Sequence, residues 1–492
     1  MAQQIAWNTP TPDDRQAFAP ELVFQAGLRN HHIANTAYPI HHTTTMRAYR
    51  APSGKIEPLA QAAWRDIDTL GLYVHVPFCK ARCRYCEYCV VDSGENSAED
   101  VYFDALLREF ALYRQRLDTT GKTLIGFDIG GGTPAFVNPT HIRRVVEAAQ
   151  ATFRFKPGLT ISIETTPIIA DREPAKLRAY KAMGIGRISM GVQTTHLQLA
   201  QSLNREFEGL GMLERAVYNI RAAEFDRFNI DLMYGFVDQT EAGWGNTVRQ
   251  TIALEPECIT LYKMRYKGTR MQEQAASVTL EKVNALETAA RELLLAAGYA
   301  GTPGKNTYSR VPGDVGTSDY LTERVVKGTP YLGLGLGAQS LSDHTLAYNL
   351  GAATKTLRPY LQAVDARRLP IQDIYHLPLD VAMAKMIAVS FYFGEIHLGH
   401  FECKFGVKLE DHFPREVAFV LEHGLMAYTG PYLRLTPEGA IHFNGVVALF
   451  YAGAVKEYLI NLEEKNPCAF RPLVSWPAVK RATLAAPFAS PR

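Results

Sequence analysis

Three cysteines in one short segment, Cys79, Cys83 and Cys86, have the spacing of ligands to a reactive metal centre. A structural zinc ion is usually enclosed by four protein ligands in a tetrahedron. An iron-sulfur cube held by only three thiolates instead leaves one iron free to bind another molecule. The C-x3-C-x2-C spacing therefore favours a [4Fe-4S] cluster with one open iron.

A zinc knuckle and a disulfide framework are the alternatives for this segment. The rest of the sequence offers no second ligand pair at C-x2-C or H-x3-H spacing, and a chain of 492 residues does not need disulfides to fold. Cys89, three residues after Cys86, can replace one of the ligands, lie beside the substrate or be buried, and we favour a place beside the substrate. Cys258, Cys403 and Cys468 are isolated and receive no role.

A run of three glycines, Gly130, Gly131 and Gly132, is followed by Thr133. Residues without a Cβ atom let the backbone approach a ligand, and the exposed N–H groups can bind a carboxylate. Taken alone, the run is equally well explained as a turn. Because it ends the strand after the cysteine segment, we expect it to hold a ligand of the metal centre.

Two acidic residues, Glu164 and Asp231, lie among apolar residues of expected strands. A buried carboxylate requires hydrogen-bond partners. The partner is either a neighbouring backbone amide or Arg187, or else a ribose or amino group of a bound ligand, which we favour. Gln193 and Arg205 follow the strand expected at 187–192, which lies between these two, and can reach the same ligand.

Tyr73 and His75 precede the cysteine segment at alternate positions, so a strand directs both side chains to one face. Tyr85 falls between two of the three cysteines. Tyrosines in strands usually belong to the core, but these positions favour packing against a cluster or an adenine ring. Tyr73 and Cys89 are the candidates for catalytic groups.

Short β-branched runs alternate with amphipathic stretches between residues 68 and 300. Strands are expected at 72–76, 124–129, 160–164, 187–192, 229–234 and 258–263, and helices at 98–117, 139–153, 174–183, 208–223, 241–254 and 280–297. This alternation predicts an α/β fold with a parallel sheet, arranged as a partial (βα)6 barrel. Ligands bind beyond the carboxyl ends of such strands, where the cysteine segment begins.

The pattern changes after residue 300. Residues 301–370 complete the barrel and contain a glycine-rich run at 331–340, and residues 371–465 form a small separate domain. Helices at 379–393, 401–405 and 415–423, a hairpin at 424–441 and a helix at 444–461 have the order of a winged-helix-like module. Residues 1–67 are an N-terminal extension that is a candidate for substrate contact, and 466–492 are a tail.

A winged-helix-like module raises the possibility of DNA binding. Its second and third helices carry Glu410, Asp411, Glu416 and Glu422 with few basic residues to meet phosphates. We therefore expect no nucleic-acid partner and regard the module as a lid over the barrel mouth.

Composition fits a globular protein with a large core. The chain is 47% hydrophobic and has a formal net charge of +2, which favours neither a polyanion nor a membrane surface as partner. No run of eighteen apolar residues occurs, and the first residues lack the pattern of a secretion signal. We expect a cytoplasmic protein without a membrane span.

These motifs together resemble the radical S-adenosylmethionine (SAM) superfamily, and in particular the branch of the oxygen-independent coproporphyrinogen III oxidases. That branch includes heme chaperones, anaerobic heme-degrading enzymes and class C methylases. The resemblance spans roughly residues 68 to 455. The strings that carry it are Tyr73-x-His-Val-Pro-Phe-Cys79, Gly130 to Pro134, Ile188 to Gln193, Asn229 to Gly235 and Gly333 to Ala338.

The resemblance implies that Cys79, Cys83 and Cys86 hold a [4Fe-4S] cluster whose open iron binds SAM. One electron from the cluster would cleave SAM to methionine and a 5'-deoxyadenosyl radical, which abstracts hydrogen from an organic substrate. It also implies an electron donor such as flavodoxin or ferredoxin. Some members bind a second SAM, for which Gly335 and Ala338 are the candidate contacts.

The sequence departs from the branch at the fourth cysteine. The coproporphyrinogen oxidases carry it two residues after the third ligand, whereas Cys89 follows Cys86 by three; heme chaperones often have an aromatic residue instead. Three functions are therefore open: oxidation of a tetrapyrrole, methyl or methylene transfer to a natural product from a second SAM, and heme binding with little SAM turnover.

The N-terminal extension is rich in basic and aromatic residues, which suit a carboxylate-bearing macrocycle or a heme iron. Surface histidines and solvated arginines are the commoner explanation. The residues concerned are His31, His32, Tyr38, His41, His42, Arg47, Tyr49 and Arg50.

Overall fold

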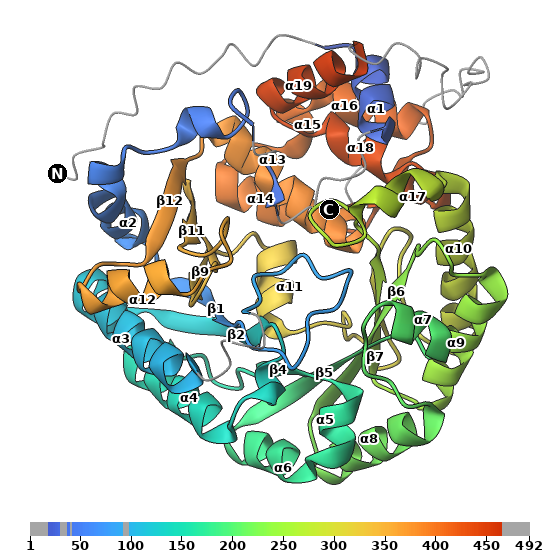
Figure 1. Ribbon diagram of the computed structural model, residues 1–492. Coiled ribbons are helices and arrows are strands. Elements are labelled where there is room, and N and C mark those ends of the chain that lie inside the picture. The colour runs from blue at the N-terminus through green and yellow to red at the C-terminus, as the bar shows by residue number, and fades with distance from the viewer. Residues whose placement is uncertain (1–17, 30–36, 40–41, 92–97, 465–492) are drawn as a thin grey trace, which may run out of the picture.

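The computed structural model describes residues 18–29, 37–39, 42–91 and 98–464 (Figure 1). Six parallel strands lie side by side in chain order. They are β1 (Thr69–Val76), β2 (Thr123–Gly131), β4 (Ile161–Thr165), β5 (Ile185–Gln193), β6 (Arg227–Tyr234) and β7 (Cys258–Lys263), and a short β3 (Arg154–Phe155) pairs with β2. The prediction of an α/β fold built on a parallel sheet is confirmed.

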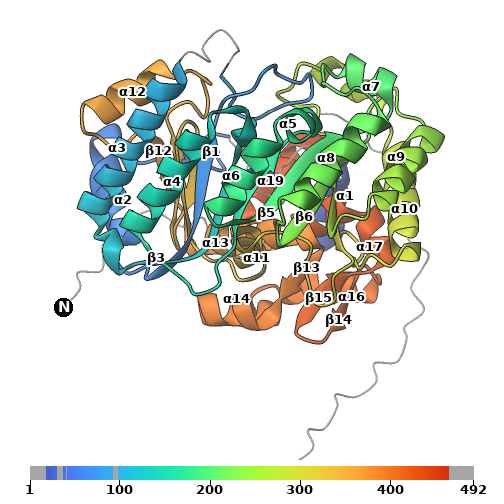
Figure 2. The ribbon, with the colours of Figure 1, turned by 90° about the horizontal axis from the view of Figure 1, so that it is seen from below.

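Helices cover the outer face of this sheet (Figure 2). They are α3 (Glu99–Leu117), α4 (Pro139–Thr152), α5 (Pro167–Arg172), α6 (Pro174–Ala182), α7 (Leu197–Ser202), α8 (Leu210–Ala222), α9 (Glu241–Ala253) and α10 (Leu280–Ala296). Local sequence sets their starts: Asn138 caps α4 by accepting from the Thr140 N–H at 2.9 Å, and proline occupies the first position. Alternate residues of β1 such as Leu72 and Val74 are fully buried, each contributing about 1.5–3 kcal/mol.

The sheet extends beyond the six predicted strands at both ends. On one side β8 (Thr307–Ser309) pairs antiparallel with β7. On the other, β9 (Tyr331–Leu334) is parallel to β1, followed by β10 (Gln339–Leu341), β11 (Thr345–Asn349) and β12 (Ile371–His376). The glycine-rich run therefore forms β9 and the turn after it. These short strands were not predicted.

A helix, α11 (Asp319–Val326), lies inside the curve of the sheet (Figure 1). Two glycines make room for it, because a Cβ atom at Gly126 would lie 2.4 Å from the Tyr320 Cα and one at Gly71 would lie 2.8 Å from the Tyr320 ring. Ser318, which caps the helix, also donates to Asp128 of β2 at 2.7 Å. The interior of the barrel is thus partly filled by protein.

The C-terminal region has its own apolar core. It comprises α13 (Leu379–Ser390), η8 (Phe391–Phe393), β13 (Glu395–His397), α14 (Leu398–Phe405), α15 (Leu409–His412), α16 (Pro414–Glu422), β14 (Met426–Thr429), β15 (Tyr432–Leu435), α17 (Pro437–Ile441), α18 (Phe443–Leu449) and α19 (Gly453–Glu464). The strands form a separate sheet in the order β13-β15-β14. Helices followed by a β-ribbon give the expected winged-helix-like order. Glu416 of α16, one of the acidic residues of this module, forms an ion pair with Lys456 of α19 at 2.7 Å.

The single helix expected at 444–461 is wrong, because the structure divides it into α18 and α19. The Ala452 N–H at the break donates to the Tyr38 hydroxyl at 2.9 Å instead of continuing the helical ladder. Tyr38 is fully buried and its ring centroid lies 4.7 Å from that of Tyr451. A residue of the N-terminal extension therefore determines where this C-terminal helix begins.

The N-terminal extension contains two helices that were not predicted, α1 (Pro20–Arg29) and α2 (Ile56–Trp64). Helix α1 packs against α18: a Cβ atom at Gly27 would lie 2.4 Å from the Ala448 Cβ. The His42 ring lies 4.5 Å from the Tyr458 ring, and Arg50 forms an ion pair with Asp373.

Among the other candidates for macrocycle contact, Tyr49 is buried and Arg47 is exposed. His31, His32 and His41 lie outside the described residues. Within the described part of the chain, no helix combines the length and apolarity of a membrane span.

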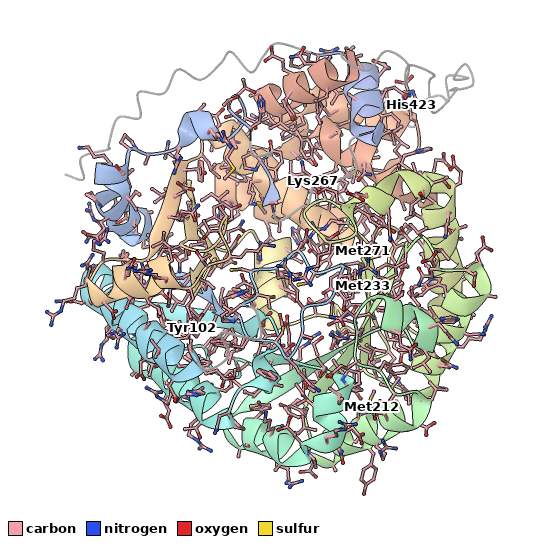
Figure 3. The ribbon with its side chains drawn as sticks, in the orientation of Figure 1. Tyr102, Met212, Met233, Lys267, Met271 and His423 are labelled. Carbon is pink, nitrogen blue, oxygen red and sulfur yellow. The ribbon has the colours of Figure 1, made fainter. Side chains whose placement is uncertain are left out.

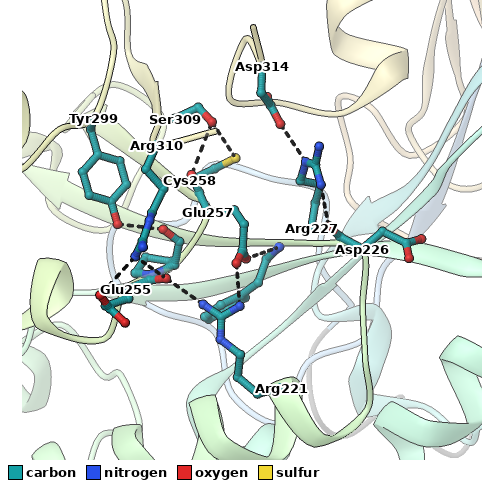
Figure 4. A network of polar contacts seen from close by, with 12 residues as sticks. Arg221, Asp226, Arg227, Glu255, Glu257, Cys258, Tyr299, Ser309, Arg310 and Asp314 are labelled. Carbon is teal, nitrogen blue, oxygen red and sulfur yellow. Dashed lines mark hydrogen bonds and ion pairs between the residues drawn. The ribbon is translucent and has the colours of Figure 1, made fainter. Parts of the chain in front are cut away.

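A polar network closes the sheet at the end opposite the cysteine segment (Figure 4). Arg227 at the start of β6 pairs with Asp314 at 2.8 Å, and Arg221 pairs with Glu257 just before β7. Cys258 is buried here and lies 3.9 Å from the Ser309 hydroxyl. This network lies at the amino ends of the strands, so the carboxyl ends are the side of the sheet where a ligand can bind.

Candidate active site

The cysteine loop leaves the carboxyl end of β1 and crosses the barrel mouth. It is closed by a hydrogen bond from the Val91 N–H to the Pro77 carbonyl at 2.9 Å. Its outer part is fixed at Arg84, whose N–H donates to Leu203 and whose carbonyl accepts from Arg270, each at 3.0 Å. Backbone contacts therefore hold the loop at its base and at its outer part.

The three cysteines of the C-x3-C-x2-C motif are half-buried, and none of them forms a disulfide in the described part of the chain. The pKa of Cys79 is raised to about 12, chiefly by burial and also by the nearby Cys86 and Cys83, against the lowering effect of a 3.4 Å contact with the Thr133 hydroxyl. Burial likewise raises the pKa of Cys86. Three crowded thiols of this kind become thiolates together only when a cation binds them.

Across the described ranges, no group of three His, Cys, Asp or Glu side chains has the arrangement of ligands to one metal ion. In a three-cysteine cube each sulfur instead bonds a different iron, so convergence on one point is not required. The Arg205 guanidinium lies 3.8 Å from the Cys83 sulfur and supplies a positive charge beside the thiols.

The glycine run at the end of β2 lies directly against the cysteine loop. A Cβ atom at Gly132 would lie 2.7 Å from the Phe78 carbonyl and 3.0 Å from the Cys79 sulfur. Gly131 has φ +125, a conformation that favours glycine, and its N–H donates to Glu164 at 3.2 Å. Glycine is therefore required here by close approach, and Gly130, where a Cβ would lie 2.8 Å from Glu164, is similar.

The two predicted carboxylates face the same interior. The pKa of Glu164 is raised to about 8, chiefly by the protein around it and in part by nearby Asp231. Asp231 accepts hydrogen bonds from Ser189 at 2.8 Å and Asn229 at 2.7 Å. Neighbours in the protein thus satisfy Asp231, whereas Glu164 retains exposed surface with a single backbone donor, Gly131.

Gln193 and Arg205 meet at the end of β5. Gln193 has φ +70, unusual for a residue with a side chain, and its buried Oε1 has no hydrogen-bond partner among the described residues. Arg205 donates to the Gly191 carbonyl. A strained backbone and an orphaned acceptor beside an arginine indicate a place where a polar ligand binds.

Tyr73 and His75 form a short chain of hydrogen bonds beneath the loop. The Tyr73 hydroxyl lies 3.3 Å from His75 Nδ1, and His75 Nε2 lies 2.6 Å from the Cys89 carbonyl. Tyr85 instead lies across the barrel mouth, 6.0 Å from the Phe236 ring, in an apolar cluster that includes Met233 and Met271 (Figure 3). The three aromatic candidates therefore lie on two sides of the cysteine loop.

Cys89 packs against the glycine-rich turn after β9. A Cβ atom at Gly337 would lie 3.1 Å from the Cys89 sulfur, which itself donates to the Gly351 carbonyl at 3.3 Å. Gly335 has φ +95, and Ala338 is buried. Cys89 thus lies against the turn that contains Gly335 and Ala338, with Gly337 as its direct neighbour.

Residues 73–250 match the sequence profile of the Radical SAM superfamily. The resemblance to that superfamily is therefore confirmed over this segment of the chain. The chain is 26% identical over 408 residues to the oxygen-independent coproporphyrinogen III oxidase of Synechocystis sp., covering 77% of this chain and 84% of the relative. The heme chaperone HemW of the same organism is 28% identical over 282 residues, which cover 55% of this chain and 66% of HemW.

The solved structure of coproporphyrinogen III oxidase (HemN) from Escherichia coli has the same fold. It is 24% identical, with a TM-score of 0.67 over 80% of this chain and 92% of the other. The prediction of a radical SAM enzyme is confirmed, and its cofactors are a [4Fe-4S] cluster and SAM. The clustered thiols, the glycines that a Cβ would obstruct and the orphaned Gln193 oxygen fit these groups.

Sequence reasoning missed several interior tyrosines of the radical SAM barrel. The Tyr88 side chain is 56% exposed, yet the surrounding protein raises its pKa. Burial is the largest cause of this rise, and Tyr392, Glu164 and Asp231 add smaller contributions. Tyr262 has the same neighbours. These side chains therefore face an accessible interior. Tyr262 lies near the end of β7, and its expected strand could have marked it as a residue of the barrel interior. Tyr392 belongs to the C-terminal region, and no sequence pattern places it near the barrel.

Proposed function

We propose that this radical SAM enzyme oxidises a carboxylate-bearing tetrapyrrole, the class of substrate named in the coproporphyrinogen III oxidases. The proposal rests on how much of each relative this chain matches. The match covers 84% of the Synechocystis oxidase but only 66% of HemW from the same organism. The interior tyrosines support it, because aromatic side chains suit a large ring system.

We assign the metal and cofactor contacts as follows. Cys79, Cys83 and Cys86 would hold the cluster, which when reduced supplies the electron that cleaves SAM to a hydrogen-abstracting radical. The SAM contacts we assign are Tyr73, His75, Tyr85, Gly130, Gly131, Gly132, Thr133, Glu164, Gln193, Arg205 and Asp231.

The protein would contribute placement and exclusion of water. The glycine run, where a Cβ atom would obstruct the site, would let SAM approach the backbone, and Gln193 would receive the hydrogen bond that its buried oxygen lacks. On the substrate side, burial raises the pKa of Cys89 to about 11, so its sulfur stays a thiol at neutral pH. We assign Cys89 and Tyr73 as neutral groups that contact the substrate.

A substrate carboxylate needs a cation, and Arg265 is our candidate. Its side chain is 31% exposed, pairs with Glu87 of the cysteine loop and lies near Tyr392. We expect Arg265→Gln to raise the substrate KM about tenfold, since a hydrogen-bonded charge contributes about 1.5–3 kcal/mol. Arg270→Gln, an exposed residue nearby, is the matched control and should leave KM unchanged.

Methyl or methylene transfer is the second candidate. It is favoured by the turn that contains Gly335 and Ala338, because this turn touches Cys89 and could hold a second SAM. Heme binding with little SAM turnover is the third candidate, since HemW is also a relative. We further propose a flavodoxin or ferredoxin as electron donor and, because the cluster needs a reducing compartment, a cytoplasmic location.

The test is anaerobic reconstitution with iron and sulfide, followed by turnover with SAM, dithionite and coproporphyrinogen III. We expect 5'-deoxyadenosine together with a porphyrinogen that has lost carbon dioxide. Accumulation of S-adenosylhomocysteine would instead favour methyl transfer. Stoichiometric binding of added heme without 5'-deoxyadenosine would favour the chaperone and overturn the proposal.

A further inference from the structure

A carboxylate outside the barrel interior is buried against the glycine-rich turn. Glu109 lies in α3, is fully buried, and accepts three hydrogen bonds from distant parts of the chain. Its donors are the Gly335 N–H at 2.9 Å, the Asn349 side-chain amide at 2.8 Å and the Tyr360 hydroxyl at 2.6 Å. Asn349 also donates to the Gly335 carbonyl at 2.9 Å, so both sides of this glycine are held.

A second residue of α3 joins the same turn to the strand that leads to the cluster. The Tyr102 hydroxyl donates to the His75 carbonyl at 2.5 Å and accepts from the Leu336 N–H at 3.2 Å. A Cβ atom at Gly335 would lie 2.4 Å from this hydroxyl. One helix face thus fixes residues 333–338, here called the glycine turn, against β1.

The glycine turn in turn touches the cysteine loop. Gly337 packs on Cys89, whose carbonyl accepts from His75. A displacement of the turn would therefore shift Cys89 and, through its carbonyl, the ring of His75, although Glu109 itself contacts neither residue.

The three hydrogen bonds to Glu109 favour its carboxylate form, whereas burial opposes the charge. Two of its three partners, the Gly335 N–H and the Asn349 amide, can only donate, so a protonated carboxyl would have to give up part of this set. The other titratable groups that face it are Tyr102 and Tyr113 on its own helix and Tyr360 on α12 (Arg358–Asp365). In the described part of the chain, no ion pair compensates its charge.

We propose that Glu109 is a positioning residue: its carboxylate holds the glycine turn in the geometry that binds a ligand beside Cys89. This deepens the proposed function and rests on it, because the ligand is the SAM or substrate assigned to that turn. Burial raises the pKa of Glu109 to about 7, so the turn should loosen as pH falls through neutrality.

The first test needs neither cluster nor turnover. Hydrogen–deuterium exchange of the 333–338 amides is compared in the wild type, Glu109→Gln and the milder Tyr360→Phe. Since a lost hydrogen bond to a charged group is equivalent to about a tenfold or larger change in local opening, exchange should accelerate by that factor in Glu109→Gln. Tyr113→Phe, on the same helix but without a hydrogen bond to Glu109, should match the wild type.

The second test uses the reconstituted enzyme with SAM as the probe. In Glu109→Gln the KM for SAM or substrate should rise about tenfold while kcat at saturation changes less than twofold, because a neutral amide weakens the turn by about one charged hydrogen bond. The wild-type KM should rise as pH falls from 8 to 6, and this rise should be smaller in the variant, where only the contribution of Glu164 remains.

Unchanged exchange at 333–338 in a folded Glu109→Gln protein would overturn the proposal even if SAM cleavage is normal. If Glu109→Gln does not fold, Tyr360→Phe decides by the same exchange measurement. Accelerated exchange without any SAM cleavage in the wild type would leave Glu109 as the anchor of the turn and refute the proposed function alone.

Discussion

The imidazole of His75 donates from Nε2 to the Cys89 carbonyl at 2.6 Å, which ties the end of β1 to the far end of the cysteine loop. A carbonyl can only accept, so Nε2 carries the proton and Nδ1 accepts from the Tyr73 hydroxyl at 3.3 Å. Burial lowers the pKa of His75 to about 4, so the ring is neutral at physiological pH. Backbone chemistry thereby fixes both the tautomer and the ring orientation.

Replacement of His75 by phenylalanine should weaken this tie. The buried Cys89 carbonyl would lose its donor, which lowers the free energy of unfolding by about 1–3 kcal/mol. Urea denaturation measures the change, and iron content after reconstitution should fall with it. His423→Phe, at a half-buried position of the C-terminal region, should leave iron content unchanged.

The same histidine makes a pH prediction. The unfolded imidazole binds a proton below about pH 6.5, whereas the folded one does so only below about pH 4. Between these values the unfolded state binds more protons, so wild-type stability falls as pH falls through this window. Stability of His75→Phe should lack this component; an unchanged pH profile would contradict the assignment of a buried neutral ring.

Gly132→Ala should disturb the site without unfolding the protein. The added methyl would lie 3.0 Å from the Cys79 sulfur and 2.7 Å from the Phe78 carbonyl, so the cysteine loop must shift. We expect at least a tenfold loss of 5'-deoxyadenosine formation, equivalent to about 1.4 kcal/mol in the barrier. Gly121→Ala, before the opposite end of β2 and in open space, is the matched control and should retain full activity.

SAM binding should release a proton from Glu164. In the ligand-free protein this carboxyl has a pKa of about 8, so it is largely protonated at pH 7. A sulfonium cation favours the carboxylate, so affinity should increase with pH up to about 8 and then level off. Calorimetry in buffers of different ionisation heat should show roughly one more proton released by the wild type than by Glu164→Gln. Equal release would exclude Glu164 from the contact.

Arg205→Gln should lower the reduction potential of the cluster. The guanidinium lies 3.8 Å from the Cys83 sulfur and favours the more negative, reduced state. We expect a decrease on the order of 60 mV, a tenfold change in the one-electron equilibrium. Arg84→Gln, an exposed residue of the same loop, should change it much less, and equal shifts in both variants would indicate a general charge effect.

The sequence predicted the elements whose signals are local. The alternation of β-branched and amphipathic runs located six strands, and the cysteine spacing located the loop after β1, because both depend on neighbours along the chain. The winged-helix-like order was also readable, apart from the break before α19. That break depends on Tyr38, more than 400 residues away, so no local pattern could reveal it.

Other features of the candidate site also depend on tertiary contacts. Glu109 reads as one acidic residue of an amphipathic helix, and only the fold brings Gly335 to it. Tyr392 enters the barrel from the C-terminal region, and α1 joins the C-terminal core although its sequence stands at the other end. Gln193 was chosen as a ligand contact from its place after a strand; its positive φ could not be anticipated.

The central claim is that Cys79, Cys83 and Cys86 hold a [4Fe-4S] cluster with one iron open to SAM. The most direct measurement is electron paramagnetic resonance of the reduced, oxygen-free protein before and after SAM is added. A cluster signal that shifts with SAM, disappears in Cys83→Ala and persists in Cys403→Ala is predicted. A signal indifferent to SAM, or a protein that contains only zinc, would contradict the claim.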